Sequence, residues 1–150
     1  MADKVWKPSG DALQVEAGGV VSVKSGGRID EEAGGAILGR AVLNAYHADI
    51  GTAGSAYVVC PFDGTVVGLE AVNIAANAGT KSVLTAKIGG ATITHPAWEV
   101  AVTAAAGTRS GVVPTAANQV FAGQVIEVAS DGGSSAVTPA MYSIVVRRQS

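Results

Sequence analysis

The amino-acid sequence predicts an all-β protein in which a short glycine-rich β-ladder precedes a jelly-roll-like β-sandwich. Valine and isoleucine greatly outnumber the five leucines, and β-branched side chains favour the pleated surface of a sheet. Many of the 20 glycines stand in pairs between short apolar runs, where their access to positive φ permits tight turns. Within several of these runs apolar and polar residues alternate, which is the period of a strand.

The first segment, residues 1–11, is predicted to be an extended arm that carries Trp6 beside Pro8. A tryptophan offers a large contact area, and a terminal segment outside a core often docks on a partner. Two roles therefore stay open for Trp6: contact with another protein, or a cap on the ladder within its own oligomer.

An eight-residue repeat follows over residues 12–35, in three units that each end in Ala-Gly-Gly or Ser-Gly-Gly. Each unit predicts a strand of about five residues closed by a glycine turn. One apolar side chain per face buries little area, so the units must stack and several chains must wrap around a common axis. The predicted oligomer interface comprises the second and fourth positions of the units: Leu13, Val15, Val21, Val23, Ile29 and Ile37. Glu31 departs from the apolar fourth position, and a flexible glycine-rich linker is the alternative.

Residues 36–54 are predicted to be a connector, partly helical, because their apolar residues fit one face of a three-turn helix. Those residues are Ile37, Leu38, Ala41, Val42, Ala45 and Tyr46. The ladder and connector together make up residues 12–54, and a separate β-sandwich domain is expected over residues 55–150.

Within that domain short strands recur every 8 to 12 residues with turn residues between them, the pattern of a sandwich or barrel. Pro96 and Trp98 interrupt the series, and residues 131–135 are predicted to be an exposed hairpin tip. The domain carries only ten charged side chains, so we expect neighbouring proteins to cover it. The predicted strands are residues 56–60, 65–74, 82–88, 91–94, 109–113, 119–121, 125–129 and 142–148.

The residues that catalysis requires are sparse, and no catalytic, cofactor-binding or metal site is predicted. His47 and His95 lie in no zinc-binding spacing, and a surface or hydrogen-bonded role is expected for each. Asp30-Glu31-Glu32 is expected to be a solvated face rather than a cation site. Arg147-Arg148 would either clamp an acidic neighbour or form a solvated tail, and Cys60 is expected to be a small buried hydrophobe.

Composition also restricts the class of partner. Of the 150 residues 48% are hydrophobic and only 15% are charged, at a net charge of −2, which excludes a disordered chain. Lysine and arginine form no basic stripe, so nucleic-acid binding is not expected. No apolar run approaches 18 residues, so no membrane partner is expected, and the first residues do not resemble a secretory signal.

The Glu-Ala-Gly-Gly, Lys-Ser-Gly-Gly, Glu-Ala-Gly-Gly series, after a Trp-Lys-Pro arm and before a small β domain, resembles the head decoration (cement) proteins and head fibres of tailed bacteriophages. The resemblance implies a homotrimer on the exterior of the virion capsid, made in the host cytoplasm, that binds the major capsid protein and stabilises the head. It implies that Val5, Trp6, Lys7 and Pro8 contact the capsid and that the repeat holds the trimer.

A second reading is a trimeric phage fibre or receptor-binding module with the β domain as its head. In that reading Trp98 is the stacking platform for a host glycan. An enzyme is not expected, because the residues that it would need are missing from the sequence.

Overall fold

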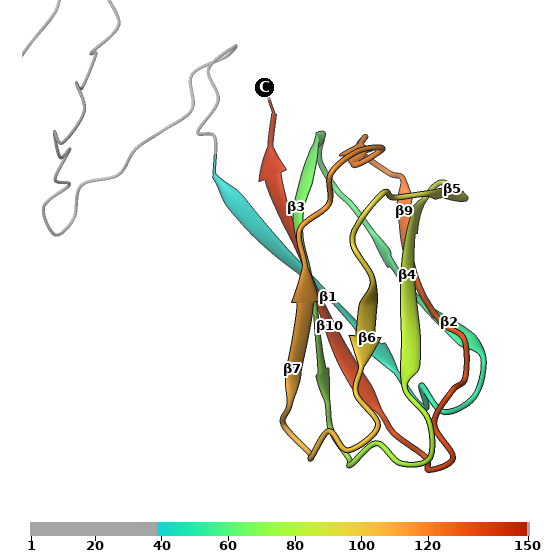
Figure 1. The fold of residues 1–150 in the computed structure, drawn as a ribbon. Coiled ribbons are helices and arrows are strands. Elements are labelled where there is room, and N and C mark those ends of the chain that lie inside the picture. The colour runs from blue at the N-terminus through green and yellow to red at the C-terminus, as the bar shows by residue number, and fades with distance from the viewer. Residues whose placement is uncertain (1–38, 150) are drawn as a thin grey trace, which may run out of the picture. The chain divides into compact units, whose positions relative to one another are not determined.

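The computed structural model describes residues 39–149, which form two antiparallel five-stranded sheets and contain no helix (Figure 1). The first sheet, sheet A, has the order β1-β10-β3-β7, with β8 also paired to β3. The second, sheet B, has the order β2-β9-β4-β5, with β6 also paired to β4. The strands are β1 (Arg40–His47), β2 (Gly54–Val59), β3 (Gly64–Asn73), β4 (Ser82–Ile88), β5 (Ala91–Thr92), β6 (Trp98–Val100), β7 (Arg109–Val112), β8 (Gln119–Val120), β9 (Val125–Ser130) and β10 (Ala140–Arg148).

Strand pairing links segments that are distant in the chain. β1 pairs with β10 and β2 pairs with β9, while β3 pairs with β7 and β8 and β4 pairs with β5 and β6. β10 also pairs with β3, and β9 with β4. As a result β9 and β10 lie inside their sheets, and β1 and β2 are edge strands.

The core lies between the two sheets and is built from one face of every long strand. Residues of β10 and of the second half of β3 alternate between buried and more exposed positions, as strands with one face on a core should. The largest fully buried side chains come from both sheets and from loops. They are Trp98, Tyr142, Ile50, Leu69, Leu84, Ile93, Ile126, Ile144, Val66, Val120, Val128 and Val146.

The expectation of a partly helical connector over residues 36–54 is wrong for the part that the structure describes. Residues 40–47 form β1, which pairs with β10 along its whole length, so the β domain begins before residue 55. In β1, Ala45 and His47 are buried whereas Val42 and Tyr46 are exposed. Because both faces of β1 carry apolar residues, apolar and polar residues do not alternate along it. The spacing of its apolar residues therefore also fits a helix.

Most of the predicted strands are confirmed, including residues 82–88 with both ends correct. The segment at residues 131–135 is not a hairpin tip, because it connects β9 in sheet B to β10 in sheet A. Ser134 is buried there, and its hydroxyl lies within hydrogen-bond distance of two carbonyl acceptors, Ala78 O (3.2 Å) and Ala136 O (3.0 Å). The burial expected for Cys60 is confirmed.

Candidate protein-interaction surface

The residues predicted to contact the capsid and to hold the oligomer all precede the described part of the chain. The structure therefore does not place the arm, with Val5, Trp6, Lys7 and Pro8, or the interface positions of the repeat. Those positions are Leu13, Val15, Val21, Val23, Ile29 and Ile37. The candidate surface described below is built from residues 39–149 alone.

Large exposed apolar side chains gather where the two edge strands β1 and β2 meet. Tyr46 is 56% exposed on the outer face of sheet A, and Tyr57 is 63% exposed on the outer face of sheet B. Their strands pack together at one edge of the sandwich and contain one charged residue, Arg40. Glu127, the cross-strand partner of Tyr57, is charged and forms an ion pair with Lys87. We call the exposed apolar residues along this edge the apolar flank; its members are Val42, Tyr46, Tyr57, Val59, Val125 and Met141.

The strand register makes part of the flank continuous with the outer face of sheet A. Tyr46 is the cross-strand partner of Met141, which is the partner of Val72, and all three are exposed. A polar row follows, in which the Ser143 hydroxyl donates a hydrogen bond to Asn44 Oδ1 (2.9 Å). Tyrosine and methionine are enriched, and most charged residues depleted, in the centres of protein interfaces.

The opposite edges of the two sheets carry paired charges instead. Arg109 on β7 forms an ion pair with Glu70 on β3, and Lys81 forms one with Glu99 on β6. Charged side chains on an edge strand discourage pairing with another chain. The apolar flank is the candidate surface for contact with another protein, and it borders the Lys87–Glu127 ion pair beside Tyr57.

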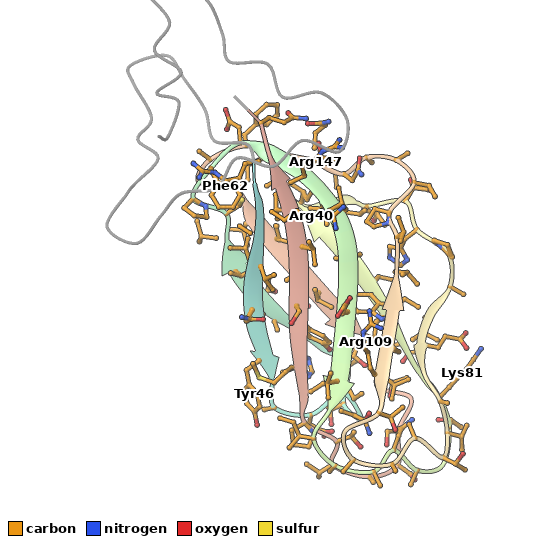
Figure 2. All side chains as sticks on the ribbon, turned by 90° about the vertical axis from the view of Figure 1, so that its left-hand side faces the viewer. Arg40, Tyr46, Phe62, Lys81, Arg109 and Arg147 are labelled. Carbon is orange, nitrogen blue, oxygen red and sulfur yellow. The ribbon has the colours of Figure 1, made fainter. Side chains whose placement is uncertain are left out.

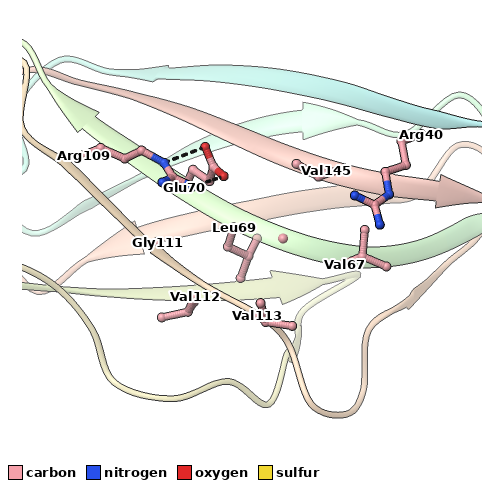
Figure 3. A pocket seen from close by; sticks show the side chains of 10 residues that line it. Arg40, Val67, Leu69, Glu70, Arg109, Gly111, Val112, Val113 and Val145 are labelled. Carbon is pink, nitrogen blue, oxygen red and sulfur yellow. Dashed lines mark hydrogen bonds and ion pairs between the residues drawn. The ribbon is translucent and has the colours of Figure 1, made fainter.

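A groove of about 290 Å³ crosses the outer face of sheet A between β10, β3 and β7 (Figure 3). Gly68 and Gly111 form part of its lining, because neither has a side chain to fill it. Arg40 stands at one end and the Glu70–Arg109 pair at the other, with Val145 and Val67 between them. The hydrogen bond from Arg109 lowers the pKa of Glu70 below its ordinary value and raises the pKa of Arg109.

The groove combines fixed charges with apolar walls. Glu70 is held ionised by its arginine, so it is poorly suited to act as a general base near neutral pH. Arg40 and the Glu70–Arg109 pair place a charged group at each end of the groove.

Trp98 is not available as a stacking platform for a glycan, because it is only 1% exposed. Its ring packs edge-on against Tyr142 with centroids 6.0 Å apart, and its Nε1–H donates a hydrogen bond to Ser110 Oγ (3.2 Å). His95 packs against the same indole at 6.1 Å. Burial raises the pKa of Tyr142, so its phenol stays protonated, as suits a core residue.

Within residues 39–149, no three histidine, cysteine, aspartate or glutamate side chains gather as a metal site would require. No helix in this part of the chain is long and apolar enough to span a membrane. No family model, curated protein or solved structure gives a significant match to the sequence.

Sequence reasoning missed the apolar flank, although a signal was present. Tyr57 and Val59 sit at alternate positions of a strand that was correctly expected, but one strand does not reveal whether it lies at an edge. Tyr46 was assigned to one face of a helix, and that assignment gave no sign that it stands exposed on an edge strand. Knowledge of the sheet order was needed to place both residues at one edge of the sandwich.

Proposed function

We propose that this chain is a structural virion protein, a decoration or cement protein that binds the outer surface of a tailed-phage head as a trimer and stabilises it. The observation that carries the proposal is the apolar flank, the exposed tyrosine, valine and methionine side chains along the β1–β2 edge of a compact β domain. Such a surface is suited to protein–protein contact. The glycine repeat before it supports assembly of several copies.

The strand order supports a jelly-roll assignment for this domain. Partners are nested, from β1 with β10 inward to β4 with β5 and β6, as in one long antiparallel hairpin wound into two sheets. β5 and β6 both pair with β4, and β7 and β8 both pair with β3. If each of these two sets is one interrupted strand, the domain has the eight strands of a jelly roll, an architecture that occurs in viral capsid proteins.

The proposed mechanism is binding without chemistry. A protein that binds only the assembled head stabilises it by mass action, by about 2.7 kcal/mol per site at a free concentration of one hundred times Kd. Three linked copies raise the effective concentration of each arm at the capsid after the first arm binds. In this proposal Val5, Trp6, Lys7 and Pro8 contact the major capsid protein, and the repeat joins the copies.

The experiment is co-sedimentation of the purified chain with heads prepared from the encoding phage after deletion of the gene for this protein. The full chain should pellet with the heads, and the treated heads should withstand higher temperature before they release DNA. Removal of residues 2–10 should abolish pelleting and leave the oligomeric mass of the protein unchanged.

Trp6→Phe is the matched control for Trp6→Ala, because phenylalanine keeps an aromatic contact of similar shape. We expect Trp6→Ala to weaken head binding at least tenfold and Trp6→Phe to weaken it much less. Failure of the full chain to pellet with the heads would refute the decoration function. Full binding by the chain without residues 2–10 would refute the role of the arm alone.

A further inference from the structure

β1 is an edge strand that carries none of the features by which sheet edges usually avoid other chains. Figure 2 shows it at the side of sheet A, next to β10 and with Tyr46 near its lower end. Its eight residues contain no proline and one charged residue, Arg40, at the first position. It pairs with β10 over all eight residues without a register shift. Since charges, prolines, β-bulges and short length are the usual protection of an edge, β1 is suited to pair with a further strand.

The other edge strands of the two sheets are shorter. β7 has four residues and begins with the charged Arg109, and β5 has only two. β2 has six residues and begins with Gly54, and glycine weakens a strand. Among residues 39–149, β1 is therefore the longest strand at a sheet edge.

The hydrogen bonds to β10 show which backbone groups of β1 face the other way. Arg148 N–H donates a hydrogen bond to Gly39 O (3.0 Å), and these two residues continue the register one step beyond the Arg40–Arg147 pair. In an antiparallel pair, hydrogen-bonded positions recur at every second residue. The odd-numbered residues of β1 therefore direct their N–H and C=O groups to β10. The even-numbered residues direct theirs to the opposite edge, which we call the outer edge of β1.

The residues at the outer edge also have exposed side chains. Val42 is 55% exposed and Tyr46 is 56% exposed, and Arg40 and Asn44 are exposed as well. Within residues 39–149 no strand pairs with this edge. A strand that approached it would thus meet both backbone hydrogen-bonding groups and apolar side chains.

The outer edge is complementary to itself when a second copy runs antiparallel. With Asn44 opposite Asn44 of the second copy, each Val42 lies opposite a Tyr46, and β-branched and aromatic residues are favourable cross-strand partners. Arg40 then lies opposite Ala48, so no like charges face each other. A shift by one residue would oppose side chains from different faces of the sheet. A shift by two residues in either direction would separate the Val42–Tyr46 pairs.

We propose that two copies of this chain pair through the outer edges of β1, antiparallel and about a two-fold axis at Asn44, so that their A sheets form one continuous sheet. Each hydrogen-bonded residue pair supplies two backbone hydrogen bonds. The partner is a second copy, because its own β1 provides the matching apolar pairs and opposes no like charge.

One strand pair is a small contact compared with the roughly 1,000 Å² or more that stable interfaces bury. We therefore expect the pairing to be weak in dilute solution and to form where copies are concentrated. If the repeat holds three copies together, the pairing joins one trimer to the next. On a phage head it would link neighbouring trimers over the surface. That consequence rests on the proposed function, whereas the pairing itself does not.

The first test is disulfide formation between copies of the full chain that carry Asn44→Cys. Directly opposed residues of a hydrogen-bonded antiparallel pair have Cα atoms about 5.5 Å apart, a distance that a disulfide spans. At about 1 mM protein, where weak contacts form, oxidised glutathione should link position 44 of one chain to position 44 of another. Peptide mapping identifies this link. Cys60 is buried and should stay reduced.

Tyr57→Cys is the matched control, because Tyr57 is similarly exposed on β2, the neighbouring edge strand. Its disulfide yield should be at least about tenfold lower. Dilution to about 10 μM should lower the yield for Asn44→Cys by a similar factor, since the contact joins separate oligomers. A yield that does not change on dilution would place the contact within one oligomer and overturn the proposal.

The second test removes the backbone donor. Val42→Pro deletes an N–H that faces the outer edge and keeps the hydrogen bonds to β10, and proline is tolerated at such positions of edge strands. In sedimentation equilibrium the mass of the full chain should double as its concentration rises to about 1 mM. Val42→Pro should keep the lower mass, whereas Val42→Ile, which retains the N–H, should still double. Circular dichroism checks that both variants are folded.

Three results would overturn the proposal: no doubling of mass, a doubling that Val42→Pro leaves intact, or disulfides that form as readily at position 57 as at position 44. None of these measurements uses phage heads. Failure of the pairing and failure of the decoration function are therefore detected separately.

Discussion

At the scale of single residues, Asp49 shows how a loop carboxylate joins distant segments. Its Oδ1 accepts hydrogen bonds from Gly51 N–H (2.8 Å) and Thr138 N–H (2.9 Å), and its Oδ2 accepts one from the Thr52 hydroxyl (2.9 Å). The bond from Thr138 is the largest cause of the lowered pKa of Asp49, with smaller contributions from Gly51 and Thr52 and an opposing one from desolvation. Asp49 thereby links the β1–β2 connection to the segment before β10.

The sign of the resulting pH dependence follows from this lowered pKa. Because the folded pKa lies below the unfolded value of about 3.9, the carboxylate contributes stability above that pH and loses it as pH falls through the folded pKa. Asp49→Ala should lower the free energy of unfolding by about 1–2 kcal/mol at pH 7. The difference from wild type should shrink below about pH 4.

Urea unfolding at pH 7 and at pH 3 measures this difference. Thr52→Ala is the control, because it removes one exposed hydrogen bond and leaves the two backbone bonds to Asp49 in place. An Asp49→Ala penalty that stays constant with pH would contradict the assignment to the ionised carboxylate.

Individual residues were predicted to different degrees from the sequence. The burial of Cys60 follows from its apolar neighbours and is confirmed. Trp98 was expected in an interrupted stretch beside Pro96, yet it begins β6 and fills the core. The sequence alone does not show whether the Trp98 side chain faces the core or the solvent. The pairing of β6 with β4 determines that it faces the core.

At the scale of elements, the connection from β9 to β10 is held by close backbone packing. An added Cβ on Gly133 would lie 1.9 Å from Lys81 O, and one on Gly132 would lie 2.3 Å from Ala53 N. Both glycines were predicted to be turn residues. A side chain at either position would also collide with backbone from a distant segment. Rules for turns consider only neighbouring residues, so they could not predict these contacts.

Gly133→Ala should therefore destabilise the β domain by about 1–3 kcal/mol, because the Lys81 carbonyl must move to admit a methyl group. Gly39→Ala is the matched control, since its Cβ would meet nothing within 4 Å, and it should change stability by less than about 0.5 kcal/mol. The measurement is the urea midpoint of each variant. Equal midpoints for the two variants would show that the loop is not tightly packed.

The strands themselves were largely predictable, because turn residues bound them and β-branched residues fill them. β1 was the exception, because Val42 and Tyr46 place apolar side chains on its exposed face. The alternation of apolar and polar residues that indicates a half-buried strand is therefore missing. The misassigned element thus coincides with part of the candidate surface. A strand that presents apolar side chains to a partner loses the alternation by which strands are recognised.

At the scale of the whole molecule, the position of β1 decides where the chain can be shortened. Removal of residues 1–54 would delete β1 and leave one edge of β10 unpaired, whereas removal of residues 1–38 keeps both sheets. We expect the full chain to be a trimer by light scattering and the chain without residues 1–38 to be a folded monomer.

Val21→Asp in the full chain should give the same monomer, because it places one charge per chain on the proposed common axis. The thermal unfolding of the β domain should not change. If the chain without residues 1–38 is still a trimer, the β domain and not the repeat forms the oligomer contact. The apolar flank would then be the candidate surface for that contact.

The nested pairing of the strands sets the order in which this domain can fold. Asn44 on β1 and Ser143 on β10 are hydrogen-bonded neighbours, yet 99 positions separate them in the sequence. Pairings this remote carry a large loop-closure entropy before any contact compensates for it, and β domains of this kind fold in milliseconds to seconds. During synthesis, β1 and β3 must wait with exposed edges until β10 leaves the ribosome. The interval before β10 arrives is therefore when the chain is most prone to aggregate.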